Sequence, residues 1–395
     1  MILTNKKSFI FILVFLTFTK IIFSFIYGDI EIDNEWNKLN QNLVQFGEFS
    51  FYEIDGQRIP SVYMPPLYSY ILYFFFKFNF EYLFTIKLVL IFQCIFSSIA
   101  IFIFKLILEK FFSKKNSSII SIIYFFFPLN FYAASQISSV SIQVSLFIFY
   151  IYFLLNFRLN FILFGICSGL LILIRGEFWL LYLLSLLCLF VQNIDFIKKI
   201  LVSFIVSVIF ISPVLIKNYK TFNQIILTKS FGYNLWRGNT EPLNLNGNNF
   251  PMTDTFLNNF KNSGYETHKF ELYFDNYFLE DAKSNIYENP LKYFKHYLRK
   301  FFAFSIFNFN SNYPNYFNPI ILIPEIFISI FAILGIGVSI FQKKNFLLLL
   351  LILYYLALIP VFFILPRYKL FILPLYFIFA SQFLFYLSNI FSKKQ

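Results

Sequence analysis

The residues best suited to chemistry are two carboxylates in a short segment, Ile32-Asp33-Asn34-Glu35-Trp36, which follows the first hydrophobic stretch. Carboxylates are scarce, since Asp and Glu together number 20 in 395 residues. An acidic cluster beside an otherwise apolar stretch is the first place to look for catalytic groups. Asp33 and Glu35 are the candidates. The alternative is that Asp33 only caps the helix that begins here.

Other residues that could support chemistry are few. Asp29 and Glu31 flank the acidic segment, and we interpret them as solvated loop charges. The Asp33–Glu35 pair could also hold a divalent cation, but no further carboxylates clearly converge on it, so no metal ligands are assigned. The three cysteines lie in apolar stretches without CxxC spacing, which indicates buried small side chains rather than a metal or redox site; they are Cys94, Cys167 and Cys188.

The elements that must position these residues are membrane helices. Hydrophobic residues make up 58% of the chain, charged residues only 13%, and the mean hydropathy is +0.68. Several apolar runs reach the roughly 20 residues that cross a bilayer core, which excludes a soluble globule. The net charge of +12 comes mostly from Lys in short loops between the apolar runs. That distribution is typical of cytoplasmic loops and does not indicate nucleic-acid binding.

We expect ten membrane spans. They are residues 8–27, 88–108, 118–134, 138–156, 160–174, 177–192, 200–216, 319–341, 346–364 and 369–390. The basic residues between them would be cytoplasmic, which puts both termini inside; these are Lys105 to Lys115, Arg158, Lys198-Lys199, Lys343-Lys344 and Lys393-Lys394. The first span follows Lys6-Lys7 but lacks a small-residue cleavage site, so we expect a retained anchor.

Two outer loops then carry the polar residues. The first loop, residues 28–87, should contain an amphipathic helix from Asn34 to Phe46, capped by Asp33 or Asn34. The apolar stretch Leu67–Phe80 has about 14 residues, which is short for a crossing helix, so we expect it to lie in the interface. The second loop, residues 217–318, should contain two helices, Asp275 to Asn289 and Pro290 to Phe304.

Five blocks of sequence resemble a known superfamily. They are Asp33-x-Glu35-Trp36 with Leu39, Asn42-Leu43 and Gly47-x-Phe49-Ser50; Pro65-Pro66-Leu67-Tyr68; Pro213 to Tyr219, with Lys217-Asn218-Tyr219; Gly232-Tyr233-Asn234-Leu235-Trp236-Arg237-Gly238-Asn239; and Arg367-Tyr368-Lys369-Leu370 with Leu373-Pro374-Leu375. In this order the blocks are similar to GT-C fold glycosyltransferases, the superfamily of dolichyl-phosphate-mannose–protein mannosyltransferases and the aminoarabinose transferase of lipid A. Lys217 stands where the superfamily usually has Arg.

The resemblance implies a sugar donor linked through phosphate to a polyprenol. Polyprenyl phosphate is a fair leaving group, so the enzyme would need a base for the acceptor and cations for the departing phosphate. The resemblance makes Asp33, at the superfamily's acidic position, the candidate general base, and Glu35 a candidate partner that tunes the base or orients the acceptor. A single displacement would invert the anomeric carbon. The chain has no counterpart of the C-terminal soluble domain of some members, so we expect a lipid or cell-surface glycan as acceptor rather than a protein.

Four cations are candidates for the donor phosphate. Arg367 comes first, because a guanidinium at a span end can fork onto a phosphate. Arg237 and Arg175 are further candidates, although Arg175 could instead pair with Glu177. Lys217, also at a span end, is better explained as an interfacial anchor. Candidate substrate contacts, which an interfacial aromatic belt could explain equally, are Tyr233, Asn234, Trp236, Asn239, Tyr68 and Tyr368.

The sequence therefore predicts an all-α polytopic membrane protein, a single GT-C-like domain over residues 1–395. We expect it in a bacterial inner membrane with its active site on the extracytoplasmic face. A transporter or flippase of lipid-linked saccharide is one alternative, disfavoured because the spans carry little charge. An O-antigen-ligase-like enzyme and a non-catalytic GT-C-like subunit are the others. His296, in a basic aromatic stretch that is typical of an interfacial helix, is not expected to be catalytic.

Overall fold

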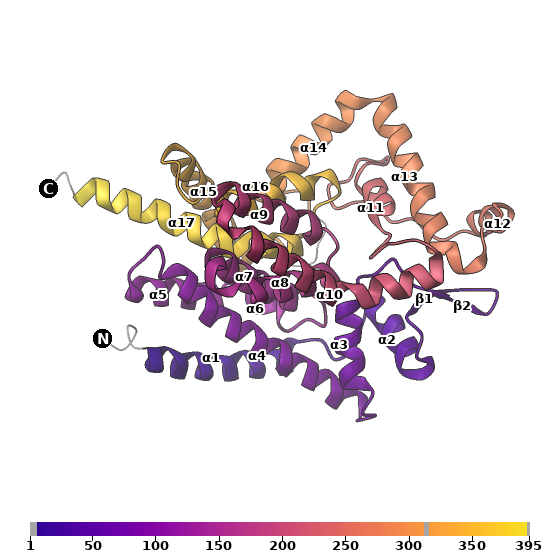
Figure 1. Cartoon of the computed structure of the whole chain (residues 1–395), viewed down its shortest axis with the longest axis horizontal. Coiled ribbons are helices and arrows are strands. Elements are labelled where there is room, and N and C mark those ends of the chain that lie inside the picture. The colour runs from indigo at the N-terminus through magenta and orange to yellow at the C-terminus, as the bar shows by residue number, and fades with distance from the viewer. Residues whose placement is uncertain (1–5, 312–315, 393–395) are drawn as a thin grey trace.

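The computed structural model describes residues 6–311 and 316–392, and it is built almost entirely of helices (Figure 1). Within those residues six helices are long and apolar enough to cross a membrane. They are α1 (Lys6–Tyr27), α4 (Tyr82–Leu108), α8 (Phe157–Ile174), α10 (Ile197–Phe222) with the short 3-10 turn before it, α15 (Pro319–Phe341), and α17 (Lys369–Ser392) with the turn Pro366–Tyr368. The chain is an integral, polytopic membrane protein, as the composition predicted. Lys393-Lys394 lie outside the described residues.

Four shorter apolar helices accompany the long ones. They are α3 (Pro66–Phe76), α7 (Val140–Leu155), α9 (Phe178–Gln192) and α16 (Phe346–Leu358), which a 3-10 turn extends to Val361. Even α7, with 16 residues, falls short of the roughly 30 Å hydrocarbon core at about 1.5 Å per residue. The count of ten crossings therefore stays a prediction.

The expected helix at 118–134 is wrong as a single element. The chain forms α5 (Lys114–Phe125) and α6 (Pro128–Ala133), with a break between them. Pro128 lacks a backbone N–H and occupies the first turn of α6, and Phe127 before it is extended, with φ −60° and ψ 126°. The residue before a proline avoids the helical region, so the helix ends there although hydropathy continues.

The predicted first outer loop contains a β-hairpin that we did not expect. Strand β1 (Ser50–Ile54) pairs antiparallel with β2 (Gln57–Pro60), and Ile54 lies opposite Gln57. The two turn residues Asp55 and Gly56 both have positive φ, 49° and 77°. An Asp-Gly pair between short strands is a strong local signal for such a turn, and it was available in the sequence.

The remaining outer helices frame the candidate site. They are α2 (Glu35–Phe46), α11 (Phe231–Gly238), α12 (Asp254–Asn262), α13 (Phe270–Glu288) and α14 (Pro290–Ser305). The two helices predicted in the second outer loop correspond to α13 and α14, which join at Pro290 and arch over α11 (Figure 1). The start of α1 and the end of α17 lie at one end of the long axis. The hairpin, α2 and α12 lie at the other.

Candidate functional site

The N-cap of α2 is Asn34, which separates the two interpretations of Asp33. The Asn34 side chain accepts the Trp36 N–H at 3.1 Å and donates to the Ile137 carbonyl at 3.0 Å, so it ties α2 to the segment before α7. Asp33 is exposed. Because Asn34 fills the capping role, the carboxylate of Asp33 is left accessible to a substrate.

Asp29 is not the solvated loop charge that we expected. It is half-buried, its carboxylate accepts the Ile137 N–H at 2.7 Å, and its own N–H donates to the Ser135 carbonyl at 3.0 Å. Burial raises the pKa of Asp29, the bond from Ile137 opposes that rise, and the negative charge of Asp33 adds to it. Asp33 therefore has a nearby acidic neighbour in Asp29, which no local pattern in the sequence indicated.

Tyr63 is the point at which the first predicted outer loop meets α11, the helix that carries Arg237. Its ring lies 6.1 Å from that of Tyr233, centroid to centroid. Burial raises the pKa of Tyr63 well above its ordinary value. The nearby charges of Arg237 and Glu35 act on it in opposite directions, Arg237 lowering that pKa and Glu35 raising it. Tyr63 was not identified from the sequence, although it stands two residues before the Pro65-Pro66-Leu67-Tyr68 block.

Two buried carboxylates on α13 hold this junction in place. Glu271 accepts the N–H groups of Val62 at 2.5 Å and Tyr63 at 2.6 Å, together with the Ser61 hydroxyl at 3.2 Å. One turn further on, Asp275 accepts the Tyr233 N–H at 3.0 Å. Burial raises the pKa of both groups, that of Glu271 to about 7. These two residues position Tyr63 and Tyr233 and were not identified from the sequence.

Arg237 is held in a fixed orientation by the loop that follows it. Its Nε donates to the Asn248 carbonyl at 3.0 Å, and its Nη2 donates to the Asn249 side chain at 2.7 Å. The guanidinium carbon lies 4.3 Å from the centroid of the Phe363 ring. A guanidinium constrained in this way loses little entropy when it binds an anion.

The two other arginine candidates gather at Tyr368. Arg175 forms the ion pair with Glu177, at 2.6 Å, and its guanidinium carbon lies 5.0 Å from the Tyr368 ring centroid. The guanidinium carbon of Arg367 lies 5.9 Å from the same centroid. The Tyr368 ring is 5.8 Å from that of Phe363, on which Arg237 rests. Phe363 and Tyr368 thus connect the three arginines into one group, which we call the arginine group.

Lys217 contacts a different ring. Its ammonium lies 5.1 Å from the centroid of Phe49, next to the hairpin, and it projects from the last part of α10. This placement fits the interfacial anchor that the sequence favoured. A role of Lys217 with the donor phosphate stays a prediction.

The predicted substrate contacts differ in accessibility. Tyr68 is fully buried, packs against Trp36 and donates to the Gln93 side chain at 3.0 Å. Asn239 is buried, donating to the carbonyls of Leu235 and Val361. These two therefore support the packing, and their contact with a sugar stays a prediction.

Tyr233, Asn234 and Trp236 are partly exposed on α11. The rings of Tyr233 and Trp236 stack with centroids 5.9 Å apart and an interplanar angle of 12°. Trp236 donates its indole N–H to Asp281 at 2.5 Å. A stacked pair fixed at both ends offers an aromatic face of the kind that sugar rings pack against.

Among residues 6–311 and 316–392, no group of three or more His, Cys, Asp or Glu residues could hold a metal ion. The arrangement as a whole offers an accessible carboxylate next to the start of α2, the packing of Tyr63 against Tyr233, and the arginine group. These are the parts that a base-assisted transfer from a phosphate leaving group requires. Comparison of the chain with models of known protein families, with curated proteins and with solved structures gives no match.

Proposed function

We propose that this protein is a membrane glycosyltransferase that moves a sugar from a polyprenyl-phosphate donor to a lipid or cell-surface glycan on the extracytoplasmic face. The observation that carries the proposal is the packing of the Tyr63 ring beside that of Tyr233, with centroids 6.1 Å apart. It supports the proposal because it brings the first predicted outer loop next to the fourth sequence block, and the charges of Glu35 and Arg237 both act on the Tyr63 hydroxyl. The arginine group adds the fifth block, through Arg367 and Tyr368.

In the proposed reaction Asp33 takes the proton from the acceptor hydroxyl. The acceptor oxygen attacks the anomeric carbon of the donor sugar, and the bond from that carbon to the phosphate oxygen breaks. The electron pair of this bond stays on the polyprenyl phosphate, and the arginine group stabilises the negative charge that develops there. One displacement inverts the anomeric carbon. Glu35 and Tyr63 would orient the acceptor next to the base.

The position of the two chain ends supports the proposed orientation in the membrane. The beginning of α1 and the end of α17 lie at the end of the molecule opposite α2 and the hairpin (Figure 1). With the termini in the cytoplasm, the candidate site would face the extracytoplasmic side. We propose a GT-C-like arrangement in a bacterial inner membrane on this basis and on the sequence blocks.

Charged side chains buried within spans do not favour transport. Lys20 in α1 donates to the Ser97 hydroxyl at 3.0 Å and lies 5.0 Å from the Phe125 ring centroid. Glu325 in α15 pairs with Lys369 in α17 at 3.1 Å. Lys20 and the Glu325–Lys369 pair are therefore engaged in contacts between packed helices. Such contacts stabilise the helix packing and do not indicate a path for a transported substrate.

The test is sugar transfer in proteoliposomes supplied with labelled polyprenyl-phosphate sugars. We expect Asp33→Asn to slow transfer by about a hundredfold or more, the size of a general-base effect. The matched control is Glu31→Gln, which removes another exposed carboxylate from the same loop and should transfer at the wild-type rate. Normal transfer by Asp33→Asn would reject the assignment of the base. Binding of lipid-linked sugar by the wild type without transfer would reject the proposal that the protein is a glycosyltransferase.

A further inference from the structure

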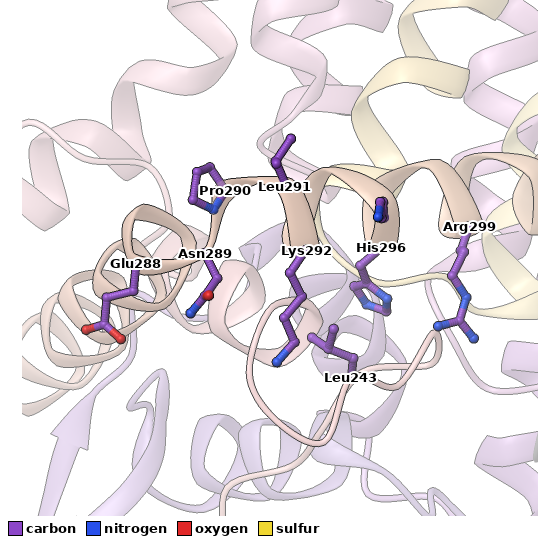
Figure 2. A pocket seen from close by; sticks show the side chains of 9 residues that line it. Leu243, Glu288, Asn289, Pro290, Leu291, Lys292, His296 and Arg299 are labelled. Carbon is purple, nitrogen blue, oxygen red and sulfur yellow. The ribbon is translucent and has the colours of Figure 1, made fainter.

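A second place suited to a ligand is a cavity of about 720 Å³ beside the first turns of α14. Its wall includes Lys292, Lys295, His296 and Arg299 from α14, Leu243 from the facing loop, and Glu288 at the end of α13. Figure 2 shows the side chains of Lys292, His296 and Arg299 extending from the helix toward the loop that carries Leu243. None of these residues belongs to the candidate transfer site.

The charges in the cavity leave two cations without acidic partners. Lys292 pairs with Glu241, and Glu288 accepts the Ser284 hydroxyl at 3.0 Å. Within the part of the chain that the structure describes, no carboxylate lies within ion-pair distance of Lys295 or Arg299. Two free cations beside one rim carboxylate suit a ligand with a single negative charge.

His296 is the buried polar group of this wall. It is only 1% exposed, and neither ring nitrogen has a hydrogen-bond partner among the described residues, although the Gly238 carbonyl lies nearby. Burial lowers the pKa of His296 to about 4, and the charges of Lys300 and Arg299 act in the same direction. The ring is therefore neutral, and because both ring nitrogens are covered, His296 contributes an uncharged wall beneath the cations rather than a donor to the cavity.

An apolar stripe runs along α14 next to these cations. Its members are Leu291 (74% exposed), Phe294 (58%), Leu298 (36%) and Phe302 (60%). At about 100° per residue these four share one face, and Lys295 and Arg299 come next around the helix, followed by Lys292 and His296. Around the helix, the apolar stripe is followed by the two free cations and then by the buried histidine. This arrangement matches an amphiphile whose charged head faces the cavity.

We propose that α14 binds the phosphate-bearing head of an anionic membrane lipid. The phosphate lies between Lys295 and Arg299, above the neutral wall formed by His296, and the lipid tails run along the apolar stripe. A soluble phosphate compound would leave that stripe in water, whereas a lipid covers it. The proposal rests on the membrane character of the chain and does not depend on sugar transfer.

Lys300 connects the lipid site to the C-terminal end of α11, the helix that carries Arg237. Buried on the inner side of α14, Lys300 donates to the Gly238 carbonyl at 3.0 Å and to the Asn239 side chain at 3.2 Å. Lipid that fixes α14 therefore also fixes the loop that follows Arg237.

The test measures the association of spin-labelled phosphatidylglycerol and spin-labelled phosphatidylcholine with the full-length protein in phosphatidylcholine nanodiscs. We expect the wild type to prefer phosphatidylglycerol. In the double variant Lys295→Ala, Arg299→Ala the preference should fall by up to about twenty-five-fold, since each cation near a membrane contributes on the order of a factor of five. Both residues are exposed, so their truncation leaves no hole in the core.

Two further variants and a competitor decide the outcome. Lys283→Ala removes an exposed lysine of α13 that pairs with Glu280 at 2.8 Å, and it should keep the preference. Phe294→Ser with Phe302→Ser should weaken the association of both lipids. An unchanged preference in the double variant, or an equal loss in Lys283→Ala, would overturn the proposal. Displacement of the lipid by soluble glycerol phosphate as readily as by unlabelled phosphatidylglycerol would show a site for free phosphate instead.

Discussion

The carboxylate of Glu271 accepts the backbone N–H of Tyr63 at 2.6 Å, so a buried acid on α13 holds the segment in which the first predicted outer loop meets α11, the helix of Arg237. Glu271 is 1% exposed and also accepts from Val62 and Ser61 through the same oxygen. The rigidity of the candidate site therefore depends on an ionisable group that is not itself part of the chemistry.

This arrangement predicts that stability falls as the pH rises toward neutrality. Burial raises the pKa of Glu271 from 4.5 to about 7. An acid whose pKa is raised by folding contributes stability that is fully present below about pH 4.5 and is lost as the pH passes about 7, by roughly 3 kcal/mol. We expect the melting temperature of the purified protein to fall between pH 5 and 7.5 and that of Glu271→Gln to change much less. Parallel curves for the two proteins would contradict this.

A second prediction concerns the packing of α15 against α17. A Cβ on Gly335 would lie 2.0 Å from the Phe379 carbonyl oxygen, whereas a Cβ on Gly337 meets nothing within 4 Å. Gly335→Ala must therefore push the two helices apart, and we expect it to destabilise the protein by about 1–3 kcal/mol. Gly337→Ala is the control on the same helix and should be neutral or slightly stabilising. Thermal unfolding of both variants in one detergent makes the comparison, and equal melting temperatures would refute the close approach.

The elements that the sequence predicted well are those set by local pattern. Helix α2 follows an amphipathic period and ends at Gly47, whose φ is 69°. Helices α13 and α14 meet where Pro290 forces a new start. The break at Pro128 was missed because hydropathy alone ignores the effect of a proline on the residue before it.

The candidate site was predictable only in part. Arg237, Arg367 and Tyr368 stand in recognisable blocks, so the sequence could propose them as candidates. Tyr63 and Asp29 owe their importance to partners that lie far away along the chain, such as Ile137, which donates its N–H to Asp29. No local spacing in the sequence indicates such a contact. The burial that raises the pKa of Asp29 likewise depends on the whole fold.

The arginine group leads to a third prediction, which concerns the donor. Arg367→Gln should slow sugar transfer by about ten- to a hundredfold, because it removes a charge-assisted hydrogen bond to the departing phosphate. Arg158→Gln is the matched control, since Arg158 is exposed. Its hydrogen bond with Lys199, from the ammonium to the backbone carbonyl of Arg158, does not involve the side chain that is changed. Initial rates over a range of donor concentrations separate a change in kcat from one in KM. Equal rates for the two variants would remove Arg367 from the proposed site.

The last prediction tests Tyr63, the residue on which the proposed function rests. Tyr63→Phe removes only the hydroxyl on which the charges of Glu35 and Arg237 act, and it keeps the ring beside Tyr233. We expect transfer to fall by roughly five- to tenfold, the effect of losing one hydrogen bond of about 1 kcal/mol to the acceptor, with little change in melting temperature. Tyr70→Phe, at an exposed position in the same loop, should leave the rate unchanged. A loss of rate in Tyr63→Phe that is accompanied by an equal loss in Tyr70→Phe would indicate a general effect of the loop. A normal rate in Tyr63→Phe would mean that the hydroxyl of Tyr63 takes no part in the reaction and that the residue only packs against Tyr233.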